Sequence, residues 1–334
     1  MKKIVQNLIK FFIPLFIGGG IIWYLYKGQD IKQILNVLHS GIKWEWIFLS
    51  LLLAILSHVA RAYRWRIQLK ALDVTPSLFD LSNSVFGNYG VNLIFPRLGE
   101  LWRCNFISKK TQKPFVTIFG SILSERLLDL ISVTSITIFA FILERKVFIS
   151  FFKEHPTIAD TILKILVSPI TFSILIISIV LILVFKKRFT KTKIYQKFHA
   201  MIMNAWQGFE TIRTMKNKWS YIFLTFGIWL LYFLNFYVCI FAFDFSKDIG
   251  IVGALTMFVM GSIGVVVPVQ GGTGPWHFMI ISTMLLYGVS QTNASTFALI
   301  VHAIQQGFVI ILGLYTMLAI FIADRLRKRV QITV

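Results

Sequence analysis

Long apolar segments recur along nearly the whole chain, and short connectors that carry charge separate them. Segments of about twenty residues cross a bilayer as helices. Such segments lie at about residues 8–26, directly after Trp46, and at about 115–143, 162–185, 219–243 and 295–322. Two further apolar segments, at about 77–107 and 250–290, are interrupted by proline and glycine. The pattern predicts an all-α, polytopic membrane protein whose residues 1–334 form one integral membrane domain with about six full spans.

The charge of the chain is strongly basic, with 34 Lys and Arg residues against 14 Asp and Glu and a formal net charge of +20. These basic residues gather in the connectors, as the positive-inside rule requires, and no nucleic-acid-binding motif accompanies them. We therefore expect anionic lipid headgroups as the counter-charge and no nucleic acid partner. The basic ends of the second span (Arg61, Arg64, Arg66, Lys70) and of the chain predict an inner-membrane protein with both termini cytoplasmic. An amphipathic helix at about 194–216 is predicted on the cytoplasmic surface.

The two interrupted segments predict re-entrant helical hairpins. Basic connectors flank residues 77–107 on both sides, so this segment is expected to enter and leave the membrane from the cytoplasm, with its break at Pro96 to Gly99. Segment 250–290 breaks at Pro268 to His277 and is expected to enter from outside. Because each break begins Pro-x-x-Gly and follows a span, residues of about 44–143 and 219–322 are predicted to be inverted-topology repeats, a common construction of secondary transporters.

Charged side chains stand inside the apolar segment 115–143. Glu125 and Asp129 share one helix face with Ser121 and Ser132, and Arg126 is three residues from Asp129. Charge at membrane depth is tolerated only where it faces protein or a wet cavity. The trio Glu125, Arg126 and Asp129 is net negative, which predicts a further positive partner, Arg97 or Arg103. The trio either ties helices together or contacts substrate, and its carboxylates are candidates for proton coupling.

The two breaks supply further candidate substrate-binding residues. Arg97 and Arg103 offer forked donors to a phosphodiester, and Glu100 is suited to orient one of them or to contact a cationic moiety. The alternative is an ordinary basic cytoplasmic loop. In the second break, backbone amides at a helix start can hold an anion, although the same glycines also suit a tight turn. These glycines are Gly271, Gly272 and Gly274.

Three polar residues share one face of the last span, namely His302, Gln305 and Gln306. They either line a cavity or hydrogen-bond to neighbouring helices. His277 is a further candidate, against the alternative of a packed polar group. No metal-ligand spacing, phosphate loop or nucleophile elbow occurs, so no catalytic residue, metal or cofactor is expected.

Three motifs together resemble a known family. They are R-L-G-E-L-W-R at residues 97–103, S-I-L-S-E-R-L-L-D at 121–129 and P-V-Q-G-G-T-G-P-W-H at 268–277. The chain resembles the flippase-like membrane domain of lysylphosphatidylglycerol synthases, which also occurs alone, over roughly residues 10–322. The resemblance implies movement of a lipid between leaflets, and we expect no lysyl-transfer domain or activity. Where the family usually has Pro-Gly-Gly followed by Glu, Gln270 precedes the two glycines here, and His277 stands near the acidic position.

These observations predict a lipid flippase that moves an anionic phospholipid or a polyprenyl-linked lipid, such as a polyprenyl phosphate, between leaflets. A homo-oligomer or an envelope-biosynthesis protein is considered as a partner. One alternative is a non-transporting, lipid-binding partner of a cell-envelope glycolipid assembly. A second is a membrane-embedded lipid phosphatase or transferase that uses His277 or His302 with Glu125 as acid and base.

Overall fold

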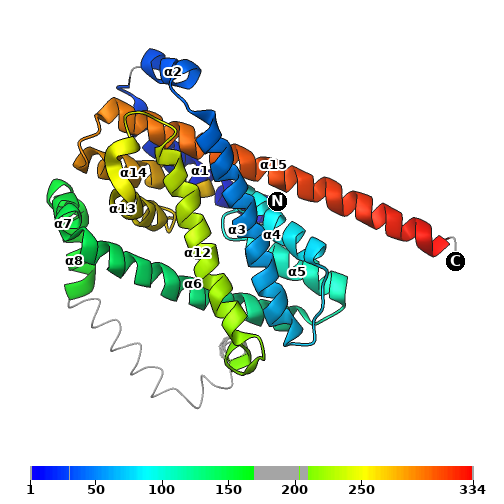
Figure 1. The fold of residues 1–334 in the computed structure, drawn as a ribbon. Helices are drawn as coiled ribbons and strands as arrows, with labels where there is room; N and C mark the ends of the chain where they lie inside the picture. The colour runs from blue at the N-terminus through cyan, green and yellow to red at the C-terminus, as the bar shows by residue number, and fades with distance from the viewer. Residues whose placement is uncertain (1, 30, 169–202, 204–209, 333–334) are drawn as a thin grey trace.

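The computed structural model describes residues 2–29, 31–168, 203 and 210–332, and this part of the chain is a bundle of α-helices without strands (Figure 1). Five helical segments in it are long and apolar enough to cross a membrane: Trp44–Lys70, Phe115–Leu143, Lys218–Ile240, Lys247–Gly264 and Gln291–Arg325. The all-α prediction is confirmed for the described residues. The predicted span at 162–185 and the amphipathic helix at 194–216 lie mostly outside them.

The helices follow one another along the chain with the labels of Figure 1. They are α1 (Lys2–Tyr26), α2 (Ile31–Ser40), α3 (Trp44–Lys70), α4 (Leu78–Ile94), α5 (Gly99–Thr111), α6 (Phe115–Leu143), α7 (Arg145–Glu154), α8 (Pro156–Val167), α12 (Lys218–Ile240), η1 (Lys247–Ile249), α13 (Gly250–Gly264), η2 (Gln270–Gly272), α14 (Pro275–Leu286) and α15 (Gln291–Ile332).

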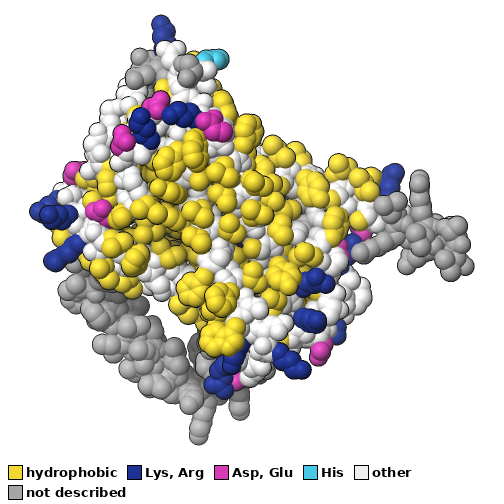
Figure 2. All heavy atoms as spheres, in the orientation of Figure 1, with side chains coloured by type: hydrophobic (Ala, Val, Ile, Leu, Met, Phe, Trp, Pro, Cys, Tyr) yellow, Lys and Arg dark blue, Asp and Glu magenta, His cyan; other side chains and the backbone are white. Residues whose placement is uncertain are grey.

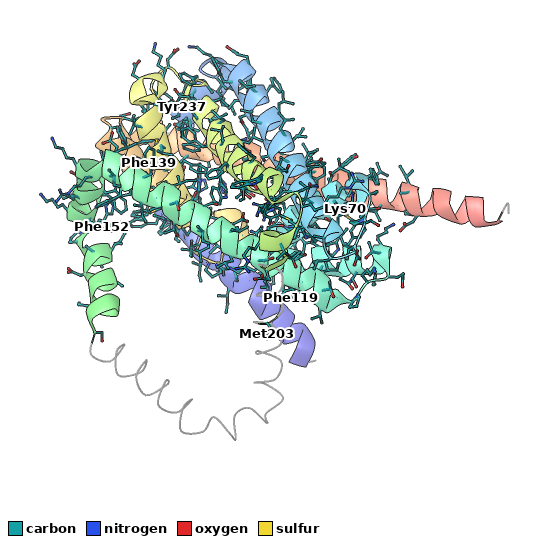
Figure 3. All side chains as sticks on the ribbon, turned by 60° about the horizontal axis from the view of Figure 1, so that its bottom comes forward. Lys70, Phe119, Phe139, Phe152, Met203 and Tyr237 are labelled. Atoms are coloured by element: carbon teal, nitrogen blue, oxygen red, sulfur yellow. The ribbon has the colours of Figure 1, made fainter. Side chains whose placement is uncertain are left out.

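Helices α3 and α12 lie side by side in the middle of the bundle and run in opposite directions (Figure 1). At one end the Lys43 ammonium contacts the Asp244 carboxylate at 2.8 Å. At the other end the Tyr221 hydroxyl donates to Gln68 Oε1 at 3.4 Å. In a second view Lys70 and Phe119 lie toward one end of the bundle, whereas Tyr237 lies toward the other (Figure 3). The two helices therefore form an antiparallel pair that runs the length of the bundle.

Helices α4 and α5 form the first predicted helix–break–helix unit. The Ser77 hydroxyl caps the start of α4 by accepting a hydrogen bond from the Asp80 amide at 3.0 Å. Proline disfavours a helical conformation in the residue before it, and α4 ends at Ile94, two residues before Pro96. Arg97 within the break has a left-handed backbone with φ of 66°. The chain then reverses, and α5 begins at Gly99. The absence of a Cβ at Gly99 allows the start of α5 to pack directly against the backbone of Asn88 in α4.

Helices α13 and α14 form the second unit. Between them the chain passes through the short helix η2, where Gly271, Gly272 and Gly274 all have positive φ, and Pro275 begins α14. Both predicted breaks are thus present as breaks between packed helices. That each hairpin is re-entrant in a membrane stays a prediction, since α13 together with η1 is also long enough to cross.

The helix contacts of the two halves correspond to one another. In each half the two short helices of the hairpin pack together, and the second of them contacts the following long helix, α6 or α15. Across the halves, α4 contacts α15 and α13 contacts α6. The central antiparallel pair consists of the first helix of each half. This is the arrangement expected of two four-helix units in opposite orientations, and the inverted repeat itself stays a prediction.

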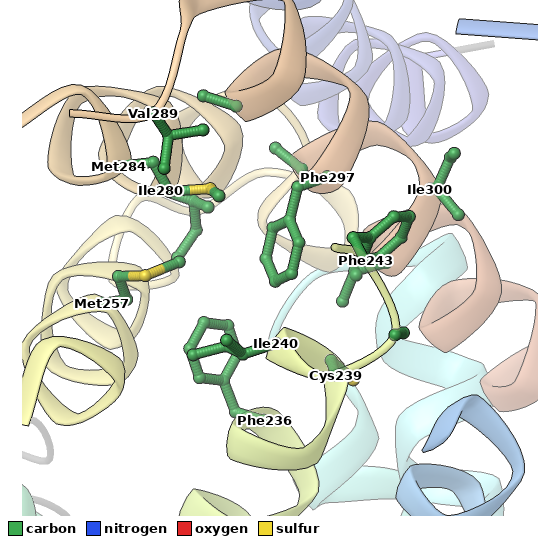
Figure 4. Close-up of a cluster of buried hydrophobic side chains, with 14 of the residues drawn as sticks. Phe236, Cys239, Ile240, Phe243, Met257, Ile280, Met284, Val289, Phe297 and Ile300 are labelled. Carbon is green, nitrogen blue, oxygen red and sulfur yellow. The ribbon is translucent and has the colours of Figure 1, made fainter. Parts of the chain in front are cut away.

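Each half has its own hydrophobic core. In the first half, buried side chains of α3, α4, α5 and α6 pack around Trp65. In the second half, α12, α13, α14 and α15 pack around Phe236, Met257, Ile280 and Phe297 (Figure 4). A belt of exposed hydrophobic side chains surrounds these cores, and Lys and Arg gather at its lower border, near the ends of α3 and α12 (Figure 2). Such a belt is the surface expected of a protein in contact with lipid.

The connector after α6 contains a helix of its own. The sequence indicates a charge-rich connector here, and residues 145–154 of it form helix α7. Its Phe148 and Phe151 are buried beside Val259 and Met260 of α13, so this helix packs its apolar face onto the second hairpin. The charges of the connector lie on the opposite face.

Candidate functional site

Six charged side chains meet between α3, α5 and α6, and we call them the arginine cluster. They are Arg61, Arg64, Arg103, Glu125, Arg126 and Asp129. Glu125 and Arg64 are fully buried, and Arg103 is buried to 99%. All of its members except Arg126 and Asp129 are at most 7% exposed, so most of the cluster is enclosed by protein. This confirms that the polar face of α6 is turned inward.

Glu125 is the centre of the cluster. Its Oε1 accepts hydrogen bonds from Arg61 Nε and Nη2 at 2.8 and 2.6 Å. The same oxygen accepts from Arg126 Nη2 at 2.9 Å and from Arg103 Nη1 at 3.3 Å. Its Oε2 accepts from Arg103 Nη2 at 2.9 Å. Three helices are thereby joined through one carboxylate.

Asp129 lies one turn further along α6 and joins α6 to α3. Its Oδ1 accepts from Arg64 Nη2 at 3.2 Å, and its Oδ2 accepts from Arg61 Nη2 at 3.1 Å. Arg126 Nη2 also contacts Oδ2 at 3.0 Å. The Asp129 side chain is 15% exposed and that of Arg126 is 39% exposed, so these two residues form the accessible edge of the cluster.

The predicted positive partner of the trio is Arg103, and Arg97 is not part of the cluster. Instead, Arg97 Nη2 donates to the Val266 carbonyl oxygen at 2.7 Å and so bridges the breaks of the two hairpins. Glu100 is half-buried and forms no ion pair with either arginine in the described part of the chain. The proposed pairing of Glu100 with Arg97 or Arg103 is therefore absent there.

Arg61 and Arg64 are functional candidates that were not predicted from the sequence. Their place in a basic stretch indicates the cytoplasmic end of a span, but both are buried. The signal that could have found them is periodicity. Buried polar residues of α3 recur every three or four positions, at Ser57, Arg61, Arg64 and Gln68, which places them on one helix face. Exposed Arg66 and Lys70, outside this stripe, keep the expected role of interface charges.

Trp65 and three polar side chains of α3 and α6 pack against the arginine cluster. The guanidinium of Arg103 stacks 3.8 Å from the ring centre of Trp65, which is fully buried. Trp65 Nε1 donates to the Ser121 hydroxyl at 2.9 Å, and Gln68 Nε2 donates to the Ser124 hydroxyl at 2.6 Å. Ser121, one turn before Glu125, and Ser124, directly before it, thus join α6 to α3. Ser121 belongs to the polar face of α6 that the sequence predicts, and its hydroxyl orients the Trp65 ring on which Arg103 stacks.

A cavity of about 270 Å³ lies next to the cluster, among α12, α13, the second break and α15, and we call it the hairpin cavity. Its walls include Gly271, His302, Gln305 and Gln306. His302 Nε2 lies 3.0 Å from the Gly271 carbonyl oxygen, and Gln306 Nε2 donates to that oxygen at 3.2 Å. The predicted polar face of the last span therefore lines a cavity.

Tyr232 of α12 connects the hairpin cavity with the arginine cluster. It lines the cavity, and its hydroxyl accepts a hydrogen bond from Arg61 Nη1 at 3.1 Å. Arg61 Nη1 also donates to the Tyr89 hydroxyl at 3.1 Å, and the two hydroxyls are 3.3 Å apart. A tyrosine pair on α4 and α12 therefore lies between the buried charges and the hairpin cavity.

The remaining predicted residues hold the second break together. His277 is 2% exposed, and its Nδ1 accepts a hydrogen bond from the Gly274 amide at 3.3 Å. The Gly272 amide donates to the Val269 carbonyl oxygen at 3.3 Å. Two of the amides proposed as anion ligands are thus already used within the break. The packed-group interpretation fits His277, whose ring centre lies 4.4 Å from that of His302.

The fold and the enclosed charges define a multi-pass, helical membrane protein with a polar interior. The chain matches the family described as lysylphosphatidylglycerol synthase TM region over residues 11–313. It therefore belongs to this family, a membrane domain associated with lipid handling and flippase-like function. No curated protein and no solved structure matches the chain. The family resemblance predicted from the three motifs is confirmed.

Proposed function

We propose that this protein moves a lipid with an anionic headgroup between the two leaflets of the cell membrane. The observation that carries the proposal is the arginine cluster, in which four guanidinium groups face two carboxylates inside the bundle. Arginine forks match the geometry of phosphate oxygens, and buried arginines at membrane depth are costly unless an anion compensates them. A phosphate-bearing headgroup is the membrane component that meets this requirement.

The second support is the pairing of two broken hairpins around an antiparallel helix pair. Secondary transporters place their substrate between such halves, near helix breaks that leave the backbone available. Here the hairpin cavity opens beside the Gly271 carbonyl, and Arg97 links the two breaks. A headgroup that leaves the cluster would meet the hairpin cavity next, past Tyr232, where Gln305, Gln306 and His302 supply polar contacts. In this proposal, the basic ends near Lys70 and the C-terminus face the cytoplasm.

A lipid-exchange assay tests the proposal. The purified protein is placed in vesicles that carry a fluorescent anionic phospholipid, and the outer-leaflet label is bleached by an impermeant reductant. We expect the wild type to exchange label faster than protein-free vesicles. The Arg126→Gln variant should slow exchange about tenfold, because it removes one charge-assisted donor from the accessible edge.

The matched control is Arg213→Gln, which makes the same chemical change in an exposed pair with Glu210. This variant should exchange lipid at the wild-type rate. Wild-type rates equal to those of protein-free vesicles would remove the transport proposal. Tight lipid binding without exchange would favour a non-transporting, lipid-binding partner, and release of phosphate from the labelled lipid would favour an enzyme.

A further inference from the structure

The arginine cluster carries more positive charge than its own carboxylates balance. Four arginines face Glu125 and Asp129, which leaves a surplus of two positive charges. Three of the four arginine side chains are at least 93% buried, and the fourth, Arg126, is 39% exposed, so one charge of the surplus lies in the interior and the other at the accessible edge. Uncompensated charge in a protein interior is strongly unfavourable. The surplus therefore indicates an anion that binds there.

The hydrogen bonds of the cluster show the same surplus. Glu125 Oε1 receives four N–H contacts, although one carboxylate oxygen has about two lone-pair directions. The Nε atoms of Arg64, Arg103 and Arg126 are buried and have no acceptor. Arg61 Nη1 turns to the neutral hydroxyls of Tyr89 and Tyr232. Three of the four arginines thus keep a buried N–H without an acceptor, and the fourth uses neutral hydroxyls.

The size of the surplus selects among headgroups. A zwitterionic headgroup supplies no net charge, and a phosphodiester supplies one negative charge and two free oxygens. A terminal phosphate supplies nearly two charges above neutral pH and three strong acceptor oxygens. We infer that the arginine cluster is specific for a terminal phosphate dianion, the headgroup of a phosphomonoester lipid, over a phosphodiester. This inference rests on the proposed function, because it takes the cluster as the headgroup site.

The geometry offers one approach for such a group. Arg126 and Asp129 are partly exposed, whereas the other members are 7% exposed or less. A phosphate that arrives at this edge meets the Arg126 guanidinium first. It can then replace the Asp129 carboxylate as the acceptor for Arg64 and Arg61, since both hold Asp129 by single contacts of 3.1 to 3.2 Å. The Glu125 carboxylate stays as the fixed base of the site.

Two lipids that differ by one methyl group test the inference. Dioleoyl phosphatidic acid carries a terminal phosphate, and dioleoyl phosphatidylmethanol is the matched phosphodiester. Binding of each to the protein in nanodiscs is measured at about pH 8, where the phosphomonoester is a dianion. We expect phosphatidic acid to bind at least about tenfold tighter, the effect of one additional charge-assisted contact.

Two single substitutions change the surplus in opposite directions. Arg126→Gln lowers the surplus to one charge, so the preference for phosphatidic acid should fall toward parity. Asp129→Asn raises it to three, so the preference should increase above that of the wild type. Arg213→Gln, the exposed control, should leave the ratio unchanged. A merely structural cluster would move both affinities together and not their ratio, and thermal melting of each variant confirms that it is folded.

Equal affinity of the wild type for the two lipids would overturn the inference. So would an affinity ratio of the two lipids that stays the same in both the Arg126→Gln and the Asp129→Asn variants. Titration with inorganic phosphate distinguishes a lipid headgroup from a free phosphate as the source of the dianion. Displacement of phosphatidic acid only at far higher concentration supports the headgroup, and equal competition supports free phosphate in the same dianion site. Because binding is measured without exchange, an absence of lipid transport would remove the proposed function and leave this test intact.

Discussion

Arg61 of α3 donates two hydrogen bonds, at 2.8 and 2.6 Å, to a single carboxylate oxygen of Glu125 on α6. Both side chains are buried, and the same oxygen also receives Arg103 from α5. Removal of one partner from a buried ion pair leaves an uncompensated charge, which costs about 3–5 kcal/mol. The stability of the first half of the bundle therefore depends on this one carboxylate.

Glu125→Gln is accordingly expected to lower the melting temperature of the detergent-solubilised protein more than Asp129→Asn does. The reason is exposure: Asp129 is 15% exposed and water can replace part of its bonding, whereas Glu125 is fully buried. Fluorescence-detected thermal melting of both variants and the wild type measures the difference. Equal melting temperatures for the two variants would contradict a central role for Glu125.

Gly99→Ala should destabilise the first hairpin. A Cβ at this position would collide with the carbonyl oxygen of Asn88, which is backbone and has no room to move. Overpacking of this kind costs about 1–3 kcal/mol. The control is Gly227→Ala on α12, where no atom lies within 4 Å of the added Cβ. That substitution should raise stability by about 0.5–1 kcal/mol, since alanine favours a helix over glycine. The opposite order of melting temperatures would show that the hairpin is loosely packed.

Tyr232→Phe should accelerate lipid exchange about tenfold or more. The Tyr232 hydroxyl accepts from Arg61 and lies 3.3 Å from the Tyr89 hydroxyl, so on the proposed transport route it helps to close the passage from the arginine cluster to the hairpin cavity. Loss of a hydrogen bond to a charged group lowers the free energy needed to open this passage by about 1.5–3 kcal/mol. Exchange in vesicles measures the rate, and Tyr63→Phe, at an exposed position of α3, is the control. Slower exchange would show that the hydroxyl carries the headgroup forward.

The Lys43–Asp244 pair predicts a defined pH dependence. Its hydrogen bond and charge hold the pKa of the Asp244 carboxyl below its usual range, and the same contact raises the pKa of the Lys43 ammonium. The stability that the Asp244 carboxylate contributes to the folded state is fully present above its ordinary pKa, near pH 4. It is lost as the pH falls through the lowered pKa. The stability that the Lys43 ammonium contributes is fully present below about pH 10, and it is lost as the pH rises through the raised pKa.

Asp244→Asn should therefore melt slightly below the wild type between about pH 4 and pH 10, and the two proteins should converge on the acid side. The difference is small because both side chains are exposed, at 44% and 70%. Melting temperatures across this pH range measure it, and high salt should reduce it. A difference that persists unchanged in strong acid would show that another interaction of Asp244 is responsible.

Local patterns were sufficient to find much of this architecture. Apolar length alone indicated the long helices, and proline with glycine indicated both breaks, because these residues act on the backbone where they stand. The inward face of α6 followed from the four-residue spacing of Glu125 and Asp129. Periodicity also placed His302 and Gln305 on one face, and of the two alternatives it left open both occur: the two residues line a cavity, and Gln305 donates to the Ser50 hydroxyl of α3.

Partners across the bundle were decided only by the tertiary structure. Arg61 and Arg97 are both arginines in basic stretches of the chain, yet the first binds Glu125 and the second reaches Val266. A helical period tells which face a side chain occupies, but the packing of distant helices decides what that face meets. For that reason the chain alone indicated charge at membrane depth, whereas the surplus of two positive charges became countable only when α3, α5 and α6 were brought together.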